Sequence, residues 1–404
     1  MNPNLDKLQT YPFEKLRQLF SGIVPNPDFR EIKLSIGEPQ HETPVFIKEA
    51  LTAGLGGLAG YPSTLGSTDL RRAIAAWMER RYGLNGIHAI DPETQVIPVN
   101  GSREALFSFA QTVIDPAAAN LQGSLPLVVC PNPFYQIYEG ATYLAGAEPR
   151  FLNTLPEDAF AFDYTSLSES EWQRVQLFYV CSPGNPTGKV LSLADWKQLF
   201  ALSDRYGFFI ASDECYSEIF FDEANPPLGA LQAAHLLGRS FERLVMFSSL
   251  SKRSNVPGMR SGFVAGDADA LKKFLLYRTY HGGAMNPAVQ AASFAAWNDE
   301  AHVRENRRQY TEKFAVVVPR LAECLGAAMP DASFYLWVRT PIPDTEFAQR
   351  LFADYNVVVL PGSYLAREVL GVNPGAGFVR IALVAPLADC IDATERIRSF
   401  ISKF

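Results

Sequence analysis

Short apolar runs that alternate with helical patterns constrain the fold of this chain more than any other feature. The runs that have the character of buried strands lie at 96–99, 176–181, 208–211 and 244–247. Between the second and the third, Ser192 and Asp195 form a capping-box pattern, and apolar residues at helical spacing continue to Gly207. Strand, helix and strand in this order make a crossover unit. The pattern from about 60 to 285 therefore predicts a mostly parallel sheet covered by helices.

The part of the chain that follows is organised differently. A basic and polar helical pattern covers about 299–323. Three short apolar runs come after it, at 333–338, 357–360 and 378–383. This arrangement predicts a smaller α+β domain.

Composition excludes several classes of protein. The net charge of −7 argues against a nucleic-acid partner, because a phosphate backbone demands basic patches. Polar and charged side chains occur throughout residues 1–20, which lack the apolar core of a signal peptide, and no stretch approaches the ~20 apolar residues that span a bilayer. The five cysteines lie far apart, and the five histidines have no ligand-like spacing. We therefore expect a cytoplasmic protein with reduced thiols, no membrane partner and no metal.

Polar side chains follow three of the strand-like runs. Lys252 comes after the run at 244–247, Asp213 and Tyr216 after the run at 208–211, and Asn185 lies in a turn-rich loop after the run at 176–181. Open α/β sheets bind ligands at the carboxyl ends of their strands, so these residues are expected at one edge. A lysine has an ordinary pKa of about 10.4 and is a poor nucleophile at neutral pH. Burial or a neighbouring cation, for which Arg260 is a candidate, would lower that pKa enough for a Schiff base with an aldehyde.

The run at 96–99 leads into Asn100, Gly101 and Ser102, where a glycine opens a helix. Helix N-termini present unpaired N–H groups and a positive dipole end. This helix start could therefore hold a phosphate. The chemistry that needs a reactive lysine, a buried carboxylate and a phosphate cradle together is that of pyridoxal phosphate.

Seven motifs in order along the chain resemble those of the class I/II pyridoxal-phosphate aminotransferases of fold type I. They are IGEP at 36–39, NGSREALF at 100–107, PNPFYQIYE at 131–139, SPGNPTG at 182–188, DECY at 213–216, SSLSK at 248–252 with Arg260, and FVRIAL at 378–383. The resemblance implies a large domain with a mostly parallel seven-stranded sheet between helices, and a smaller α+β domain. We expect the large domain at 45–285 and the small domain at 1–44 and 286–404.

The resemblance also implies roles for the residues that carry it. Lys252 would form the Schiff base with the cofactor and act as the general acid and base. Asp213 would contact the pyridine nitrogen, and Tyr216 and Asn185 would contact the phenolic oxygen. Tyr135, with Phe134 as its rival, would stack on the ring. The phosphate would be held by Ser249, by Arg260 and by the backbone of Ser102 and Arg103, since Arg103 departs from the small residue often found there.

Substrate and partner contacts follow in the same way. Arg380 would grip the α-carboxylate with help from Asn185 and the backbone of Gly37. Tyr61 resembles the tyrosine that reaches the neighbouring subunit's phosphate, which predicts a C2 homodimer. The sequence leaves open whether Pro133 and Pro186 follow cis peptide bonds.

Within this family, the runs at 34–41 and 248–267 are most similar to those of N-succinyldiaminopimelate aminotransferases. The expected reaction moves the amino group of glutamate to N-succinyl-2-amino-6-oxopimelate. Alternatives are an aminotransferase for another oxo acid, of aspartate, aromatic or LL-diaminopimelate type, and a C–S lyase on the same fold. A pyridoxal-phosphate-sensing regulator would carry an added DNA-binding segment, which we do not expect here because the chain has neither the extra length nor a basic patch. Gly54–Ala59 fits a loose dinucleotide fingerprint, but it follows a helical pattern rather than a strand.

Overall fold

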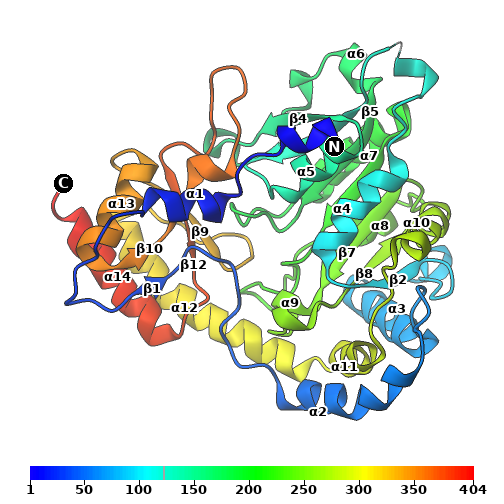
Figure 1. The fold of residues 1–404 in the computed structure, drawn as a ribbon, viewed down its shortest axis with the longest axis horizontal. Helices are drawn as coiled ribbons and strands as arrows, with labels where there is room; N and C mark the ends of the chain where they lie inside the picture. The colour runs from blue at the N-terminus through cyan, green and yellow to red at the C-terminus, as the bar shows by residue number, and fades with distance from the viewer. Residues whose placement is uncertain (122) are drawn as a thin grey trace.

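A seven-stranded sheet organises the larger part of the molecule. In the computed structural model, which describes residues 1–121 and 123–404, the strands follow the spatial order β2-β8-β7-β6-β5-β3-β4 (Figure 1). Only β8 runs antiparallel to its neighbours, β7 and β2. The strands are β2 (Val96–Val99), β3 (Leu127–Asn132), β4 (Glu148–Asn153), β5 (Val175–Cys181), β6 (Phe209–Asp213), β7 (Leu244–Ser249) and β8 (Gly262–Gly266). The predicted mostly parallel sheet is confirmed.

Helices cover both faces of this sheet, because successive strand residues point to opposite sides. Val245 belongs to the core under one layer of helices, and Met246 belongs to the core under the other. The first layer consists of α4 (Ser102–Val113), α5 (Ile137–Leu144) and α10 (Ala268–His281). The second consists of α2 (Val45–Ala53), α3 (Thr68–Tyr82), α7 (Leu193–Tyr206), α8 (Ala230–Leu236) and α11 (Pro287–Trp297). The short α6 (Glu169–Trp172) and α9 (Leu250–Arg253) complete the helices of this part.

The ends of α7 are those that its sequence predicts. The Ser192 side chain accepts a hydrogen bond from Asp195 N, and the Asp195 side chain accepts one from Ser192 N, which forms the capping box. Gly207 ends the helix with φ of 79°, a left-handed conformation that glycine adopts without strain. At Gly54–Ala59 the structure has a 3-10 helix after α2, so the dinucleotide-binding alternative is wrong.

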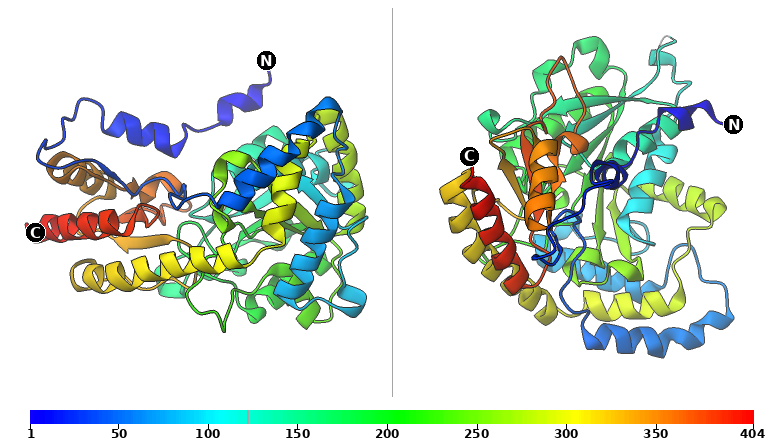
Figure 2. Two further views of the ribbon diagram at one scale, coloured as in Figure 1. Left: turned by 90° about the horizontal axis from the view of Figure 1, so that it is seen from below. Right: turned by 60° about the vertical axis from the view of Figure 1, so that its left-hand side comes forward.

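A smaller α+β part is built around its own apolar core. The strands β9 (Tyr335–Arg339), β11 (Leu360–Pro361) and β12 (Phe378–Ala382) form an antiparallel sheet, and β1 (Ile32–Lys33) pairs with β10 (Val357–Val358). The helices are α1 (Pro12–Leu19), α12 (Ala301–Leu325), α13 (Asp344–Tyr355) and α14 (Leu387–Ile401). Figure 2 shows the N-terminal segment and the long α12 running between the two parts. The three predicted apolar runs thus all lie at strands.

One helix bears on the division of the chain into domains. Ala296 and Trp297 of α11 are buried in the core of the large sheet, together with Trp77 of α3. The helix α11 therefore packs against the large part of the molecule, although the sequence analysis places residues from 286 onward in the smaller domain. The division itself remains a prediction. Among the described residues, no helix is both long and apolar enough to cross a membrane.

Candidate active site

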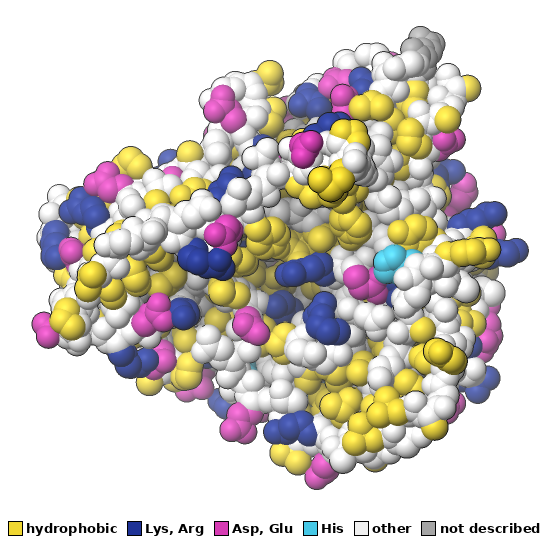
Figure 3. Space-filling view, in the orientation of Figure 1, with side chains coloured by type: hydrophobic (Ala, Val, Ile, Leu, Met, Phe, Trp, Pro, Cys, Tyr) yellow, Lys and Arg dark blue, Asp and Glu magenta, His cyan; other side chains and the backbone are white. Residues whose placement is uncertain are grey.

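A cavity of about 890 Å³ lies at the carboxyl ends of the central strands, between the two parts of the molecule. Its wall combines residues of the large sheet, such as Asp213 and Ser249, with residues of the small part, such as Tyr335 and Arg380. The N-terminal segment contributes Tyr11 and its neighbours. Figure 3 shows Lys and Arg side chains gathered in this hollow among hydrophobic ones. The volume is in the range of pockets that hold a cofactor with a small substrate.

Lys252 lies in α9, directly after β7, and its side chain lines the cavity. Nζ donates a hydrogen bond to the carbonyl oxygen of Gly37. Burial lowers the pKa of Lys252 to about 8, and the positive charges of Arg380 and Arg103 add to this effect. The neighbouring cations are therefore Arg380 and Arg103 rather than Arg260, on which the sequence argument relied. A lysine in this environment has a sizeable neutral fraction at physiological pH.

Asp213, the last residue of β6, is buried at the floor of the cavity. Its Oδ2 accepts a hydrogen bond of 2.7 Å from the Tyr138 hydroxyl, and its Oδ1 accepts one of 3.3 Å from Cys215 N. Burial raises the pKa of Asp213, whereas these hydrogen bonds and the positive charge of Lys252 oppose the rise. The carboxylate therefore lines the cavity as a hydrogen-bond acceptor, to which a protonated ring nitrogen could donate.

An anion cradle lies where α4 begins. The Arg260 guanidinium packs over Gly101, where a Cβ atom would come within 2.2 Å of Nη2, so only glycine leaves room for it. Ser102 opens the helix, and the buried Ser249 lies at the end of β7. Gly262 keeps the same region open, because a Cβ there would lie 3.3 Å from Ser102 N. Helix N–H groups, two serines and a guanidinium thus converge on a space suited to a phosphate.

Arg380 enters the cavity from β12 and is almost fully buried. Nη1 donates to Asn185 Oδ1 at 2.8 Å, and Nη2 donates to the carbonyl oxygen of Ser35 at 2.7 Å. The guanidinium lies 4.3 Å from the centre of the Tyr335 ring, and its buried Nε has no partner among the described residues. A buried guanidinium with unused donors is suited to a substrate carboxylate.

Two aromatic side chains next to each other differ in position. Tyr135 lines the cavity, and its hydroxyl accepts a hydrogen bond from Arg103 Nε. Phe134 is buried against Phe151 and is not part of the cavity wall. The geometry therefore favours Tyr135 as the stacking residue. Tyr61 is fully exposed and lies outside the cavity of its own chain.

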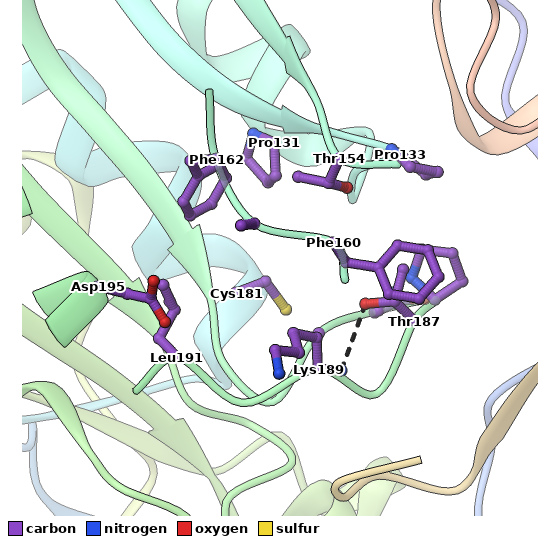
Figure 4. A pocket seen from close by; sticks show the side chains of 14 residues that line it. Pro131, Pro133, Thr154, Phe160, Phe162, Cys181, Thr187, Lys189, Leu191 and Asp195 are labelled. Atoms are coloured by element: carbon purple, nitrogen blue, oxygen red, sulfur yellow. Dashed lines mark hydrogen bonds between the residues drawn. The ribbon is translucent and has the colours of Figure 1, made fainter. Parts of the chain in front are cut away.

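A second cavity lies behind the loop that carries Asn185. It has a volume of about 40 Å³, enough for a few waters but too small for a substrate. Figure 4 shows it between Phe160, Phe162 and Cys181, with the loop held by a hydrogen bond of 3.3 Å from Lys189 N to Thr187 Oγ1.

The peptide bonds that precede Pro133, Pro183 and Pro186 are cis.

Sequence reasoning missed two tyrosines of the site. Tyr138 holds Asp213 from α5, and the hydroxyls of Tyr335 and Tyr216 lie 2.9 Å apart. Tyr335 also explains why residue 37 is glycine, because a Cβ there would lie 1.8 Å from the Tyr335 hydroxyl. Tyr138 is the final tyrosine of the PNPFYQIYE motif, which was the available signal. Tyr335 belongs to no quoted motif.

A buried polar chain, also missed, ties the segment around Gly37 to Lys252. Lys313 Nζ and His41 Nε2 are 2.7 Å apart, and His41 Nδ1 and Asn306 Oδ1 are 2.8 Å apart. Asn306 Nδ2 in turn donates to the backbone oxygen of Lys252 at 3.0 Å. Burial and the charge of Lys313 lower the pKa of His41 to about 4, so the imidazole is neutral at physiological pH. The described residues contain no metal-ligating cluster.

The residues of the cavity fit pyridoxal phosphate. The glycine-lined cradle at α4 matches its phosphate, and the buried carboxylate of Asp213 matches its pyridine nitrogen. The amine of Lys252 opens into the same cavity and could bond its aldehyde. The space above Asp213 is bordered by the Tyr135 side chain, which could cover the ring.

Comparison with known proteins agrees with this geometry. The profile of the family "Aminotransferase class I and II" matches residues 30–397. An LL-diaminopimelate aminotransferase of Nitratidesulfovibrio vulgaris is 33% identical over 91% of this chain and 90% of its own length. The crystal structure of an aminotransferase from Neisseria meningitidis Z2491 superimposes with a TM-score of 0.94 at 54% identity, covering 99% of this chain and 100% of that one. A probable N-succinyldiaminopimelate aminotransferase from Thermus thermophilus gives a TM-score of 0.81 at 26% identity, covering 95% and 96%.

Proposed function

Because this chain belongs to the class I and II aminotransferases and is a pyridoxal-phosphate-dependent enzyme, we propose that it moves the amino group of glutamate to N-succinyl-2-amino-6-oxopimelate. One observation supports amino transfer above all others. The Lys252 amine, with a pKa of about 8, opens into the same cavity as the buried Asp213 and Arg380. The substrate follows from the similarity of the runs at 34–41 and 248–267, and the Thermus neighbour supports it.

The role of Lys252 follows from its low basicity. When bound, pyridoxal phosphate supplies an aldehyde that bonds to amines and a ring that accepts electrons. Lys252 Nζ would hold that aldehyde until an amino acid takes its place. The neutral Lys252 amine would then accept the proton of the substrate Cα and return it to the carbon on the other side of the substrate nitrogen. The Gly37 carbonyl, which accepts a hydrogen bond from Nζ, keeps the amine directed toward the cavity.

Asp213 and Tyr216 tune the ring by charge and hydrogen bonding. Asp213, held by Tyr138, would stabilise a proton on the ring nitrogen, because an unpaired buried carboxylate is strongly disfavoured. The Tyr216 hydroxyl and the Asn185 amide would donate to the phenolic oxygen. Both residues line the cavity.

Arg380 orients the substrate by its α-carboxylate. Its contacts with Asn185 and Ser35 fix the guanidinium plane before any substrate arrives. A carboxylate held by this plane would lie in the cavity that Lys252 also lines. Alignment of this kind is a principal source of rate enhancement.

A second candidate substrate is LL-diaminopimelate itself. The curated relatives at 30–33% identity over nine tenths or more of this chain carry that activity in their names. The two amino donors, N-succinyl-LL-diaminopimelate and LL-diaminopimelate, differ only at the distal amine, which is succinylated in one and free in the other.

A panel of single half-reactions tests the proposal. Holoenzyme is mixed with glutamate, N-succinyl-LL-diaminopimelate or LL-diaminopimelate, and the loss of the yellow aldehyde form is followed by absorbance. We expect rapid conversion by glutamate and by the succinylated donor. Conversion by the free diamine alone would transfer the assignment to the second candidate. Release of ammonia or pyruvate without consumption of 2-oxoglutarate would instead indicate a lyase.

We also propose that the working unit is a homodimer. Large hydrophobic side chains are exposed on neighbouring surfaces, namely Val45, Leu55, Leu58, Tyr61 and Phe294. They lie on or next to α2, the 3-10 helix that follows it and α11, which pack against one another, and Figure 3 shows hydrophobic side chains gathered in that region. An exposed apolar patch of this kind marks an interface. Tyr61 of one chain would then approach the phosphate cradle of the other.

A further inference from the structure

The segment 34–44 forms neither a helix nor a strand, yet its backbone contacts both cations of the proposed reaction. The Ser35 carbonyl accepts a hydrogen bond of 2.7 Å from Arg380, and the Gly37 carbonyl accepts one from Lys252 Nζ. A segment outside helices and sheet ladders needs other contacts to keep a fixed position. The relative placement of the two cations therefore depends on what holds this segment.

The far end of the segment is held by His41, whose two ring nitrogens have different roles. Asn306 Nδ2 donates to the backbone oxygens of Lys252 at 3.0 Å and of Arg253 at 3.4 Å, so Oδ1 is the accepting atom of that amide. His41 Nδ1 lies 2.8 Å from this Oδ1 and therefore carries the proton, which leaves a lone pair on Nε2. His41 thus donates toward α9 and accepts a hydrogen bond on its other side.

Lys313 of α12 supplies the donor to that lone pair. Its Nζ lies 2.7 Å from His41 Nε2 and 3.3 Å from each of the carbonyl oxygens of Leu383 and Val384, which follow β12 directly. Three acceptors match the three N–H groups of an ammonium. Burial lowers the pKa of Lys313 to about 8, so most of these side chains remain protonated at pH 7. A directed chain of hydrogen bonds therefore runs from the end of β12 to the backbone of α9.

We propose that His41 and Lys313 are positioning residues, which fix the segment 34–44 so that the Lys252 amine and the Arg380 guanidinium keep one arrangement across the cavity. Neither positioning side chain belongs to the described cavity wall, so both act without touching the substrate. The inference rests on the proposed function, because it assumes that these two cations serve amino transfer. A displacement of about 1 Å between reacting groups can cost on the order of 100-fold in rate.

The test combines the glutamate half-reaction of the holoenzyme with hydrogen–deuterium exchange of the apoenzyme. His41→Phe keeps the aromatic ring that packs against Tyr310 but removes both hydrogen bonds. We expect its maximal rate to fall about 10- to 100-fold, with an apparent affinity for glutamate within about threefold of the wild type, since Arg380 keeps its contact with Asn185. In the apoenzyme, the peptide that spans α9 should exchange about tenfold faster.

Two further variants and a control accompany this test. His41→Gln can accept from Lys313 and donate to Asn306, so it should recover most of the rate. Lys313→Met removes the charged donor at the other end of the chain and should repeat both effects, which also serves if His41→Phe does not fold. His88→Phe should change neither quantity, because His88 is a buried histidine that bonds the Arg239 carbonyl at 2.9 Å outside the described cavity wall.

The outcomes separate this inference from the proposed function. A wild-type rate in His41→Phe, or unchanged exchange of α9, would overturn the inference. Equal losses in His88→Phe, or no recovery in His41→Gln, would overturn it as well, since either result indicates a general packing defect. A wild-type enzyme that does not convert glutamate would contradict the proposed function, whereas faster exchange of α9 in the His41→Phe apoenzyme would still support the positioning of Lys252.

Discussion

At the scale of single residues, the central feature is an amine of low basicity. With a pKa of about 8, roughly one tenth of the Lys252 side chains are neutral at pH 7, compared with fewer than about one in a thousand for an ordinary lysine. Burial is the main cause, and the charges of Arg380 and Arg103 act in the same direction. Substitutions that add charge nearby should therefore change reactivity without contacting the substrate.

The first prediction concerns pH. Because a lowered pKa makes the neutral amine available at lower pH, the rate at which apoenzyme recombines with pyridoxal phosphate should rise about tenfold between pH 7 and 9 and then level off near the top of that range. Stopped-flow absorbance of the bound chromophore measures this rate. A rate that keeps rising beyond pH 10 would show that Lys252 has an ordinary pKa.

The second prediction concerns Arg380. Arg380→Ala should weaken the binding of carboxylate substrates by about 2–5 kcal/mol, because it removes a buried, hydrogen-bonded charge. The concentration dependence of the glutamate half-reaction measures the effect. Arg339→Ala, at an exposed position on the neighbouring β9, is the matched control. An unchanged apparent affinity would restrict Arg380 to a scaffolding role.

Residues at strand ends could be placed from the sequence, and those that arrive by tertiary packing could not. Lys252, Asp213 and Asn185 follow apolar runs, so the pattern alone brings them to one edge of the sheet. Tyr335 comes from β9 of the smaller part of the molecule. Lys313 lies on α12 of the same part and contacts His41. Nothing in local periodicity records such long-range contacts.

At the scale of elements, local signals predicted the ends of α7 and the mostly parallel sheet, but they did not predict the direction of β8. The capping box of α7 is visible in the sequence, because both of its hydrogen bonds are made within four residues. The reversed direction of β8 is not visible, since an apolar run such as Gly262–Gly266 is the same in a parallel or an antiparallel strand. The packing of α11 on the large sheet likewise depends on contacts with α2 and α3.

The third prediction tests one of these elements. Ser192→Ala removes the side chain that accepts from Asp195 N, so it should lower the free energy of unfolding by about 1 kcal/mol and leave the half-reaction rate unchanged. Urea denaturation followed by circular dichroism measures the stability. Ser21→Ala, at an exposed serine whose side chain makes no hydrogen bond among the described residues, should change neither quantity. A loss of activity without a loss of stability would contradict the assignment of Ser192 to capping alone.

At the scale of the whole molecule, the exposed patch and the position of Tyr61 point to assembly. A side chain as large as tyrosine that is fully exposed on its own chain is consistent with burial against a partner. If Tyr61 completes the phosphate cradle of a second chain, cofactor affinity and assembly are coupled.

The fourth prediction follows from that coupling. Tyr61→Phe should leave a dimer in sedimentation equilibrium, because it keeps the aromatic ring, but it should release pyridoxal phosphate faster on dialysis. Leu58→Asp, which places a charge in the patch, should shift the protein toward monomer and lower cofactor retention as well. A wild-type protein that is monomeric and fully active would rule out a shared site.

The measurement that tests the account most directly is the site of covalent cofactor attachment. Holoenzyme is reduced with borohydride and digested, and mass spectrometry locates the pyridoxyl group, with Lys252→Ala as the control. The account predicts a single adduct on the Lys252 side chain in the wild type and none in the variant, together with loss of the glutamate half-reaction. An adduct on another lysine, or a variant that still converts glutamate at the wild-type rate, would contradict it.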